Sequence, residues 1–141
     1  MYGVLKVFHA RTHTHTHTRC TVVNFNGMIV FDKHVKIVEP ITDYRGLDKS
    51  LSPDVLLHGE EFETLHKAVS EIIKDRIIIG HSLSSDFEAL RIIQPMHQVR
   101  DTAYSSLFCP DGPRPLKSLV MDRLGINFEY GVQTSVRILN F

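Results

Sequence analysis

A single change of hydrophobic periodicity constrains the fold of this chain more than any other feature of its sequence. Residues 61–76 predict an amphipathic helix, because their apolar side chains recur every three or four positions. The next residues, 77–79, are all isoleucine, a run too short for a helix and too β-branched for a loop. They predict a buried strand that ends at Gly80. A helix that leads directly into a buried strand is typical of layered α/β folds. The apolar positions of the helix are Phe62, Leu65, Val69, Ile72 and Ile73.

The segment before this unit predicts a β-hairpin. Residues 21–25 and 28–31 are rich in apolar and β-branched side chains, and they flank Asn26-Gly27, a dipeptide typical of type I′ turns. The second strand is expected to continue through residues 34–37 until Pro40 stops it. Residues 1–8 have the composition of another short buried strand.

The segment after Gly80 predicts a second helix. Ser85 and Glu88 are three residues apart and fit a capping box, so the helix is expected to begin with Ser85 as its N-cap. Pro95 is expected to end it. Its inward-facing residues are expected to be Phe87, Leu90 and Ile93.

The remaining elements complete the prediction of fold class. Residues 99–102 predict a short strand, and residues 116–124 predict a helix that Gly125 closes. A hairpin followed by helix, strand and helix indicates an α/β fold with a mixed sheet flanked by helices. The 141 residues suit one domain, and 43% hydrophobic with 23% charged residues is ordinary for a soluble globular protein.

The bulk composition also excludes several classes of protein. Cys20 and Cys109 are the only cysteines, which argues against a disulfide scaffold and fits a reducing compartment. No apolar run approaches the roughly 20 residues that a membrane span needs. Lys6 interrupts the apolar opening of the chain and no cleavage pattern follows, so we expect no signal peptide.

Residues 12–18 alternate threonine and histidine, which makes them the one low-complexity stretch of the sequence. On an extended strand the histidines would share one face, where imidazoles can bind zinc, nickel or copper. A CA-dinucleotide repeat in DNA encodes the same alternation, which favours a translated repeat or flexible tract. We therefore separate an atypical N-terminal segment, residues 1–18, from a domain at residues 19–141.

Several segments, taken in order and spacing, resemble the small DEDDh 3′–5′ exonucleases that act on RNA. They are residues 19–24, 32–33, 41–45, 80–90 and 100–102, with a weaker match at residues 115–125. The resemblance implies an RNase H-like fold in which four carboxylates hold two Mg²⁺ or Mn²⁺ ions about 3.5–4 Å apart. A histidine acts as general base toward the attacking water. The family places an Asp-x-Glu pair on the first strand, an Asp at a helix start after Gly-His, and a late His-x-x-x-x-Asp.

Two residues of this chain match functional positions of the family. Asp86 matches the helix-start acid, which implies a catalytic and metal-binding role. Arg45 matches the arginine of the Thr-Asp-Tyr-Arg loop, which implies contact with the bound nucleotide. His81 is expected to be a packed or hydrogen-bonded residue rather than the base, and the family gives Asp101 no metal role.

Other family positions hold residues that cannot perform the chemistry. No Asp or Glu precedes Asp32, so the first-strand pair is missing. At the late motif, Gln133 occupies the histidine position and Ile138 the aspartate position. Because one carboxylate cannot hold two dications close together, and glutamine does not cycle a proton, we expect the chain as written to be catalytically inactive.

The sequence therefore predicts a 3′–5′ exonuclease-family domain that acts on single-stranded RNA or DNA, most simply as a monomer and without a membrane. The alternatives are a non-catalytic nucleic-acid-binding pseudo-nuclease, and a metal-binding or interaction protein that uses the histidine tract. The net charge of zero neither supports nor excludes nucleic-acid binding. Backbone amides at the start of the Asp86 helix are expected to offer donors to phosphate. We expect a nuclear or nucleolar location, with a cytoplasmic one as the alternative.

Overall fold

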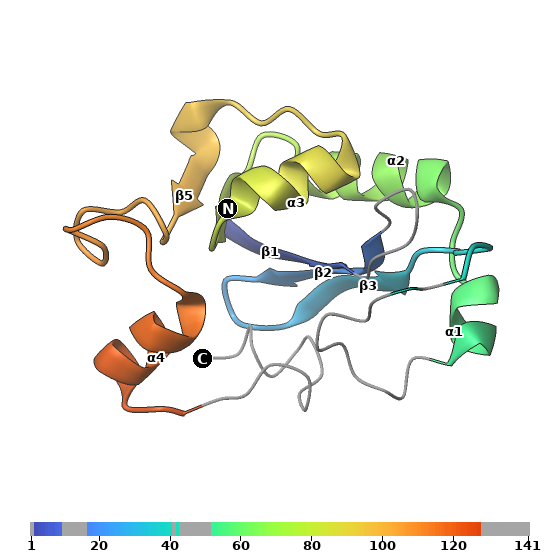
Figure 1. The fold of residues 1–141 in the computed structure, drawn as a ribbon. Helices are drawn as coiled ribbons and strands as arrows, with labels where there is room; N and C mark the ends of the chain where they lie inside the picture. Colours follow the sequence, from blue (N-terminus) through green and yellow to red (C-terminus); the bar gives the residue numbers. More distant parts are fainter. Residues whose placement is uncertain (1, 10–16, 41, 43–51, 128–141) are drawn as a thin grey trace.

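The computed structural model describes residues 2–9, 17–40, 42 and 52–127 (Figure 1). Within these residues, five strands form one mixed sheet in the order β3-β2-β1-β4-β5. The hairpin strands β2 and β3 pair antiparallel, β1 pairs antiparallel with β2, and β1, β4 and β5 run parallel to one another. The strands are β1 (Tyr2–His9), β2 (His17–Asn24), β3 (Ile29–His34), β4 (Ile77–Gly80) and β5 (Val99–Asp101). The predicted α/β class, with a mixed sheet flanked by helices, is confirmed.

The helices are α1 (Pro53–Leu57), α2 (Phe62–Ile73), α3 (Leu83–Leu90) and α4 (Leu116–Leu124), with a short 3₁₀ turn η1 (Met96–Gln98). Helices α2 and α3 lie on one face of the sheet, and α4 lies toward the other (Figure 1). None of the described helices is long and apolar enough to cross a bilayer. The helix predicted at 116–124 is confirmed, and Gly125 closes it in the left-handed region with a φ of 68°.

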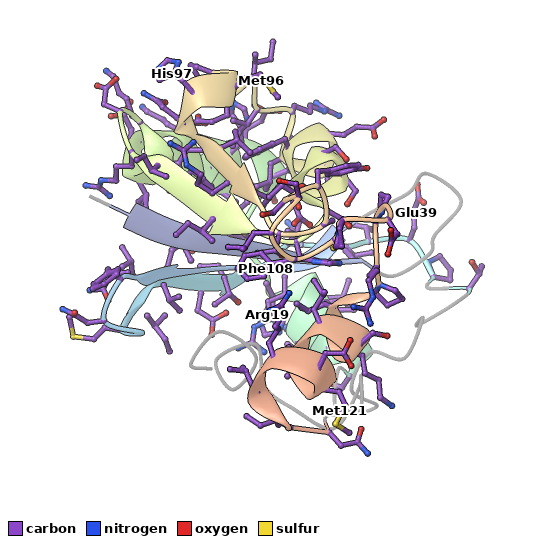
Figure 2. The ribbon with its side chains drawn as sticks, turned by 90° about the vertical axis from the view of Figure 1, so that its left-hand side faces the viewer. Arg19, Glu39, Met96, His97, Phe108 and Met121 are labelled. Atoms are coloured by element: carbon purple, nitrogen blue, oxygen red, sulfur yellow. The ribbon has the colours of Figure 1, made fainter. Side chains whose placement is uncertain are left out.

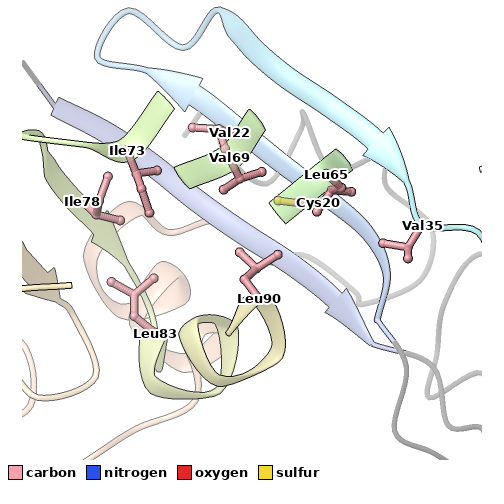
Figure 3. Packing of buried hydrophobic residues seen from close by; sticks show 9 residues of the cluster. All are labelled: Cys20, Val22, Val35, Leu65, Val69, Ile73, Ile78, Leu83 and Leu90. Carbon is pink, nitrogen blue, oxygen red and sulfur yellow. The ribbon is translucent and has the colours of Figure 1, made fainter. Parts of the chain in front are cut away.

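The main core lies between the sheet and the pair α2 and α3, as Figure 3 shows. The predicted amphipathic helix is confirmed as α2, since its buried residues recur at a spacing of four. Strand β4 supplies Ile78, and α3 supplies Leu83 and Leu90. The cluster consists of Cys20, Val22, Val35, Leu65, Val69, Ile73, Ile78, Leu83 and Leu90.

Strand β1 occupies the centre of the sheet. The prediction of a strand at residues 1–8 is confirmed, with bounds Tyr2–His9. In register, Leu5 pairs with Val22 and Val7 with Cys20 on one side, while Val4 pairs with Ile79 on the other. The last two residues of the threonine–histidine repeat, His17 and Thr18, lie within β2, while residues 12–16 lie outside the described part of the chain.

The hairpin between β2 and β3 is present, but its turn is not type I′. Type I′ requires positive φ at both central residues, and here only Gly27 has it, at 75°. The Gly27 amide donates to the Asn24 carbonyl (3.0 Å), and the Asn24 amide donates to the Met28 carbonyl (2.9 Å). The side-chain oxygen of Asn24 also accepts from the Asn26 and Met28 amides (both 3.0 Å). This local bonding favours a three-residue loop that ends on glycine.

The second hairpin strand is shorter than predicted, because it ends at His34 rather than continuing through residues 34–37. The Lys36 amide donates to the Glu60 carbonyl (2.8 Å) and the Ile37 amide to the Leu56 carbonyl (2.9 Å). The chain therefore leaves the sheet and bonds to α1 and to the segment between α1 and α2. Close approach there requires a glycine: a Cβ on Gly59 would lie 2.6 Å from the Lys36 nitrogen.

The prediction for α3 was wrong at both ends. The helix begins at Leu83, with Ser82 as N-cap in the left-handed region (φ 58°), so Ser85 is not its cap. It ends at Leu90, because Arg91 also adopts a left-handed conformation (φ 52°), and Pro95 lies beyond it. Ile93 is therefore outside the helix and 97% exposed rather than inward-facing.

Candidate functional site

Asp86 lies in the first turn of α3, on the face that packs against the sheet. It shares this face with Leu83 and Leu90, and only 1% of it is exposed. Asp86 also affects Cys20 on strand β2. The pKa of the Cys20 thiol is raised to about 12, mainly by burial and further by the negative charges of Asp86 and Asp32. The residue that matches the helix-start acid is thus enclosed between α3 and the middle of the sheet.

Strand β1, on which α3 packs, provides no second acid. No residue of β1 is Asp or Glu, so this strand adds no carboxylate whichever of its residues face Asp86. Across the ranges that the structure describes, no three or more His, Cys, Asp or Glu side chains gather as a metal site. Paired Mg²⁺ or Mn²⁺ ions need several oxygen ligands to offset their mutual repulsion. The described residues around Asp86 do not fit such a pair.

The side chain of Asp101, at the end of β5, caps the start of α3. Its Oδ1 accepts from the Ser82 amide and its Oδ2 from the Leu83 amide, both at 2.8 Å. Oδ1 also accepts from the Ala103 amide at 2.9 Å. One carboxylate therefore satisfies two of the first amides of the helix and complements its dipole. The expectation that the start of this helix offers its amides to phosphate is wrong for these two, because Asp101 already binds them.

His81 and Thr102 join the carboxyl ends of β4 and β5. The Thr102 hydroxyl donates to the Gly80 carbonyl (3.0 Å), so its oxygen accepts from the Nδ1 hydrogen of His81 (2.9 Å). The Thr102 amide also donates to the Gly80 carbonyl at 2.9 Å. The prediction that His81 is a hydrogen-bonded residue is confirmed. These bonds fix the edge of the sheet from which α3 departs.

A polar cluster on β2 and β3 was not predicted. Arg19 donates from Nε to Oδ1 of Asp32 (2.7 Å) and from Nη2 to Oδ2 (2.5 Å). The hydroxyl of the fully buried Thr21 also donates to Oδ1 (2.9 Å). Partial burial alone would raise the pKa of Asp32, but the hydrogen bonds from Arg19 and Thr21 and the charge of Arg19 hold that pKa below its usual value.

The Arg19–Asp32 pair also affects the pKa of His34. Partial burial and the nearby Arg19 charge lower the pKa of His34, although Asp32 opposes them. The cluster depends on the register of β2 with β3, in which Arg19 pairs with His34 and Thr21 with Asp32, and alternation along each strand does not determine that register.

Some predicted site residues lie outside the described residues. Arg45 and its neighbours Asp43 and Tyr44 are among them, as are Gln133 and Ile138. The structure therefore places Asp86, His81 and Asp101, and it leaves the proposed nucleotide contact of Arg45 as a prediction.

The chain is similar in sequence to several RNA exonucleases. It is 38% identical over 122 residues to RNA exonuclease 4 of Mus musculus, an alignment that covers 84% of this chain and 28% of that protein. Identity to RNA exonuclease 4 of Aspergillus fumigatus is 37% over 122 residues, covering 84% and 39%. The human apoptosis-enhancing nuclease is 31% identical over 86 residues, covering 61% and 26%. No protein-family model matches the sequence.

Solved structures support the fold. The Neurospora crassa Pan2 catalytic unit (protease and nuclease domain) superposes with a TM-score of 0.82 at 21% identity, covering 99% of this chain and 25% of that one. The Saccharomyces cerevisiae Pan2 pseudoubiquitin hydrolase-RNA exonuclease module in complex with AAUUAA RNA gives a TM-score of 0.79 at 19% identity, covering 99% and 27%.

The fold is therefore that of the RNase H-like exonucleases, with α3 and its acid packed on a mixed sheet. The chain resembles the DEDDh 3′–5′ exonucleases in sequence and in fold. Exonucleases of this family generally use divalent metal ions. The chain spans 28% and 39% of the length of the two RNA exonuclease 4 proteins compared above.

Proposed function

We propose that this chain is an exonuclease-family domain that binds single-stranded RNA without hydrolysing it. One observation carries the proposal: the central strand β1 holds no carboxylate, so Asp86 receives no acidic partner from it. The relatives support the choice of RNA, because they are RNA exonucleases and because yeast Pan2 has been solved with RNA.

The chemistry supports loss of hydrolysis. The two-metal mechanism needs one ion to generate the attacking hydroxide and another to stabilise the leaving oxygen. A single aspartate cannot hold both ions, and Gln133 at the position of the general base cannot accept a proton near neutral pH. Groups that act as a unit are not partly dispensable, so nearly all of the rate enhancement would be lost.

Binding is proposed to survive this loss. The acids of an active member repel phosphate unless metal ions intervene, so a site with fewer acids needs no metal to admit a strand. Arg45 is the proposed phosphate contact, since the amides of Ser82 and Leu83 are bound by Asp101. Contacts made chiefly to the backbone predict an affinity in the micromolar range or weaker that falls steeply with salt.

Two measurements test the proposal. The first follows shortening of a single-stranded RNA with Mg²⁺ or Mn²⁺ present, with Asp86→Ala as the matched control. We expect no shortening above background, and activity that Asp86→Ala abolishes would refute the loss of hydrolysis.

The second measurement titrates a labelled oligonucleotide at two salt concentrations, with Mg²⁺ or with EDTA. We expect salt-sensitive binding that is equal in both and weaker in Arg45→Ala. Absence of binding at low salt, or a strict requirement for Mg²⁺, would refute binding by the metal-free site.

A further inference from the structure

The loop between β5 and α4 presents an aromatic side chain to solvent. Tyr104 is 68% exposed, only three residues beyond the end of β5. Leu107, in the same loop, is 70% exposed. Large apolar groups exposed together on an otherwise bonded loop are candidates for a binding surface.

The backbone on both sides of Tyr104 is firmly held. Ala103 and Cys109 are buried, and the Cys109 thiol donates to the Thr102 carbonyl (3.4 Å). The Tyr104 amide donates to the Asp101 carbonyl (3.3 Å), and the Phe108 and Cys109 amides both donate to the Ser105 carbonyl (3.0 and 2.8 Å). The loop is thus pre-organised, and exposure of Tyr104 does not come from a frayed segment.

Helix α4 contacts the same loop through a positively charged side chain. The guanidinium of Arg123 donates to the Leu107 carbonyl (3.0 Å) and lies 5.7 Å from the centre of the Phe108 ring. Figure 2 views the molecule from the side on which the labelled Phe108 lies, with α4 next to it. A fixed loop with an exposed aromatic ring therefore lies beside a cationic side chain.

The loop begins where ligands of α/β sheets commonly bind, at the carboxyl ends of parallel strands. Strands β4 and β5 end together there, with Gly80 paired to Asp101, and α3 departs from the same edge. We propose that Tyr104 is a stacking platform for one base of a single-stranded nucleic acid. The proposal rests on the proposed RNA-binding function and assigns it a base contact.

A nucleobase fits this surface better than a purely anionic or aliphatic ligand. An exposed aromatic ring stacks on any base, because every base has a π-face, while the Arg123 charge attracts the flanking phosphate. The contact would therefore be tolerant of sequence. It would also depend on the ring of Tyr104 and not on its hydroxyl.

The test compares binding of a short single-stranded RNA by the full chain and three variants. Tyr104→Ala should weaken binding by about tenfold, as loss of one stacked base does, while Tyr104→Phe should bind like the unchanged chain. Phe25→Ala is the control, because Phe25 is also exposed (76%) but lies at the β2–β3 hairpin. An abasic strand of equal length should bind Tyr104→Ala and the unchanged chain equally.

A fluorescence measurement gives an independent readout. The sequence contains no tryptophan, so Tyr104→Trp introduces a single reporter. We expect the RNA to quench it and the abasic strand to leave it unquenched. Equal RNA affinities for the unchanged chain and Tyr104→Ala, or an unquenched tryptophan under saturating RNA, would overturn the platform alone. Failure of the unchanged chain to bind any strand would overturn the proposed function and the platform with it.

Discussion

Replacing Asp101 by alanine should loosen the start of α3, because this carboxylate accepts three backbone hydrogen bonds of 2.8, 2.8 and 2.9 Å. Loss of a helix N-cap costs about 0.5–2 kcal/mol, and a hydrogen bond to a charged group contributes about 1.5–3 kcal/mol. The three bonds share one carboxylate and water can reach part of the vacated site, so these values do not add. We expect a loss of about 3 kcal/mol in the free energy of unfolding.

The assay is thermal unfolding followed by circular dichroism. For a chain of this size, 3 kcal/mol corresponds to a fall of about 10 °C in Tm. Asp101→Asn should lose less, because one amide oxygen can still accept from Ser82 and Ala103, while the amide nitrogen opposes the Leu83 donor. Asp111→Ala, an exposed position in the next loop, is the control and should change stability by less than about 0.5 kcal/mol. If Asp101→Ala has the same Tm as the Asp111→Ala control, Asp101 does not cap α3.

Three further predictions concern other parts of the fold. Gly59→Ala would place a Cβ 2.6 Å from backbone atoms of Val35 and Lys36, so urea unfolding should show a loss of about 3 kcal/mol, and an unchanged midpoint would contradict the close approach. The lowered pKa of Asp32 means that its carboxylate stabilises the fold above its ordinary pKa of 3.8, and that this contribution is lost as pH falls through the lower folded value. The stability advantage over Asp32→Asn should therefore be full at neutral pH and shrink below about pH 4; a pH-independent difference would exclude it. Cys20, with its pKa raised to about 12, should resist alkylation at pH 8 until urea unfolds the chain, and peptide mass spectrometry would detect any native labelling that contradicts this.

The elements that were predicted correctly are those whose signals are local. Helix α2 follows from its own periodicity, and α4 ends at a glycine directly beyond its last residue. Strand β4 follows from three consecutive isoleucines. The start of helix α3 was placed three residues too late, with Ser85 as N-cap in place of Ser82, because the side chain that caps it belongs to Asp101, which lies 19 residues beyond Ser82 in the sequence. The spacing of residues within the helix cannot predict a capping side chain that belongs to another strand.

In the candidate site, too, only features with a local signal could be predicted from the sequence. The position of Asp86 at the start of a helix after Gly80 and His81 could be predicted from the sequence, and the structure encloses it against the sheet. The pairing of Arg19 with Asp32 could not, because it depends on the register of β2 with β3. That register follows from the three-residue turn together with the irregularity between Val22 and Val23, and the dipeptide Asn26-Gly27 determines neither.

The central place of β1 has a consequence for the kinetics of folding. Strands β2 and β3 are joined by a short turn and can pair early, since little chain entropy is lost. The parallel pairing of Tyr2 with Ile77 closes a loop that contains the hairpin, α1 and α2, so it carries a large entropic cost. Contacts of such long range slow folding more than local contacts of equal strength. We therefore expect the docking of β1 between β2 and β4 to limit the folding rate. Until β1 docks, the β2–β3 hairpin and the β4–β5 pair are not joined into one sheet.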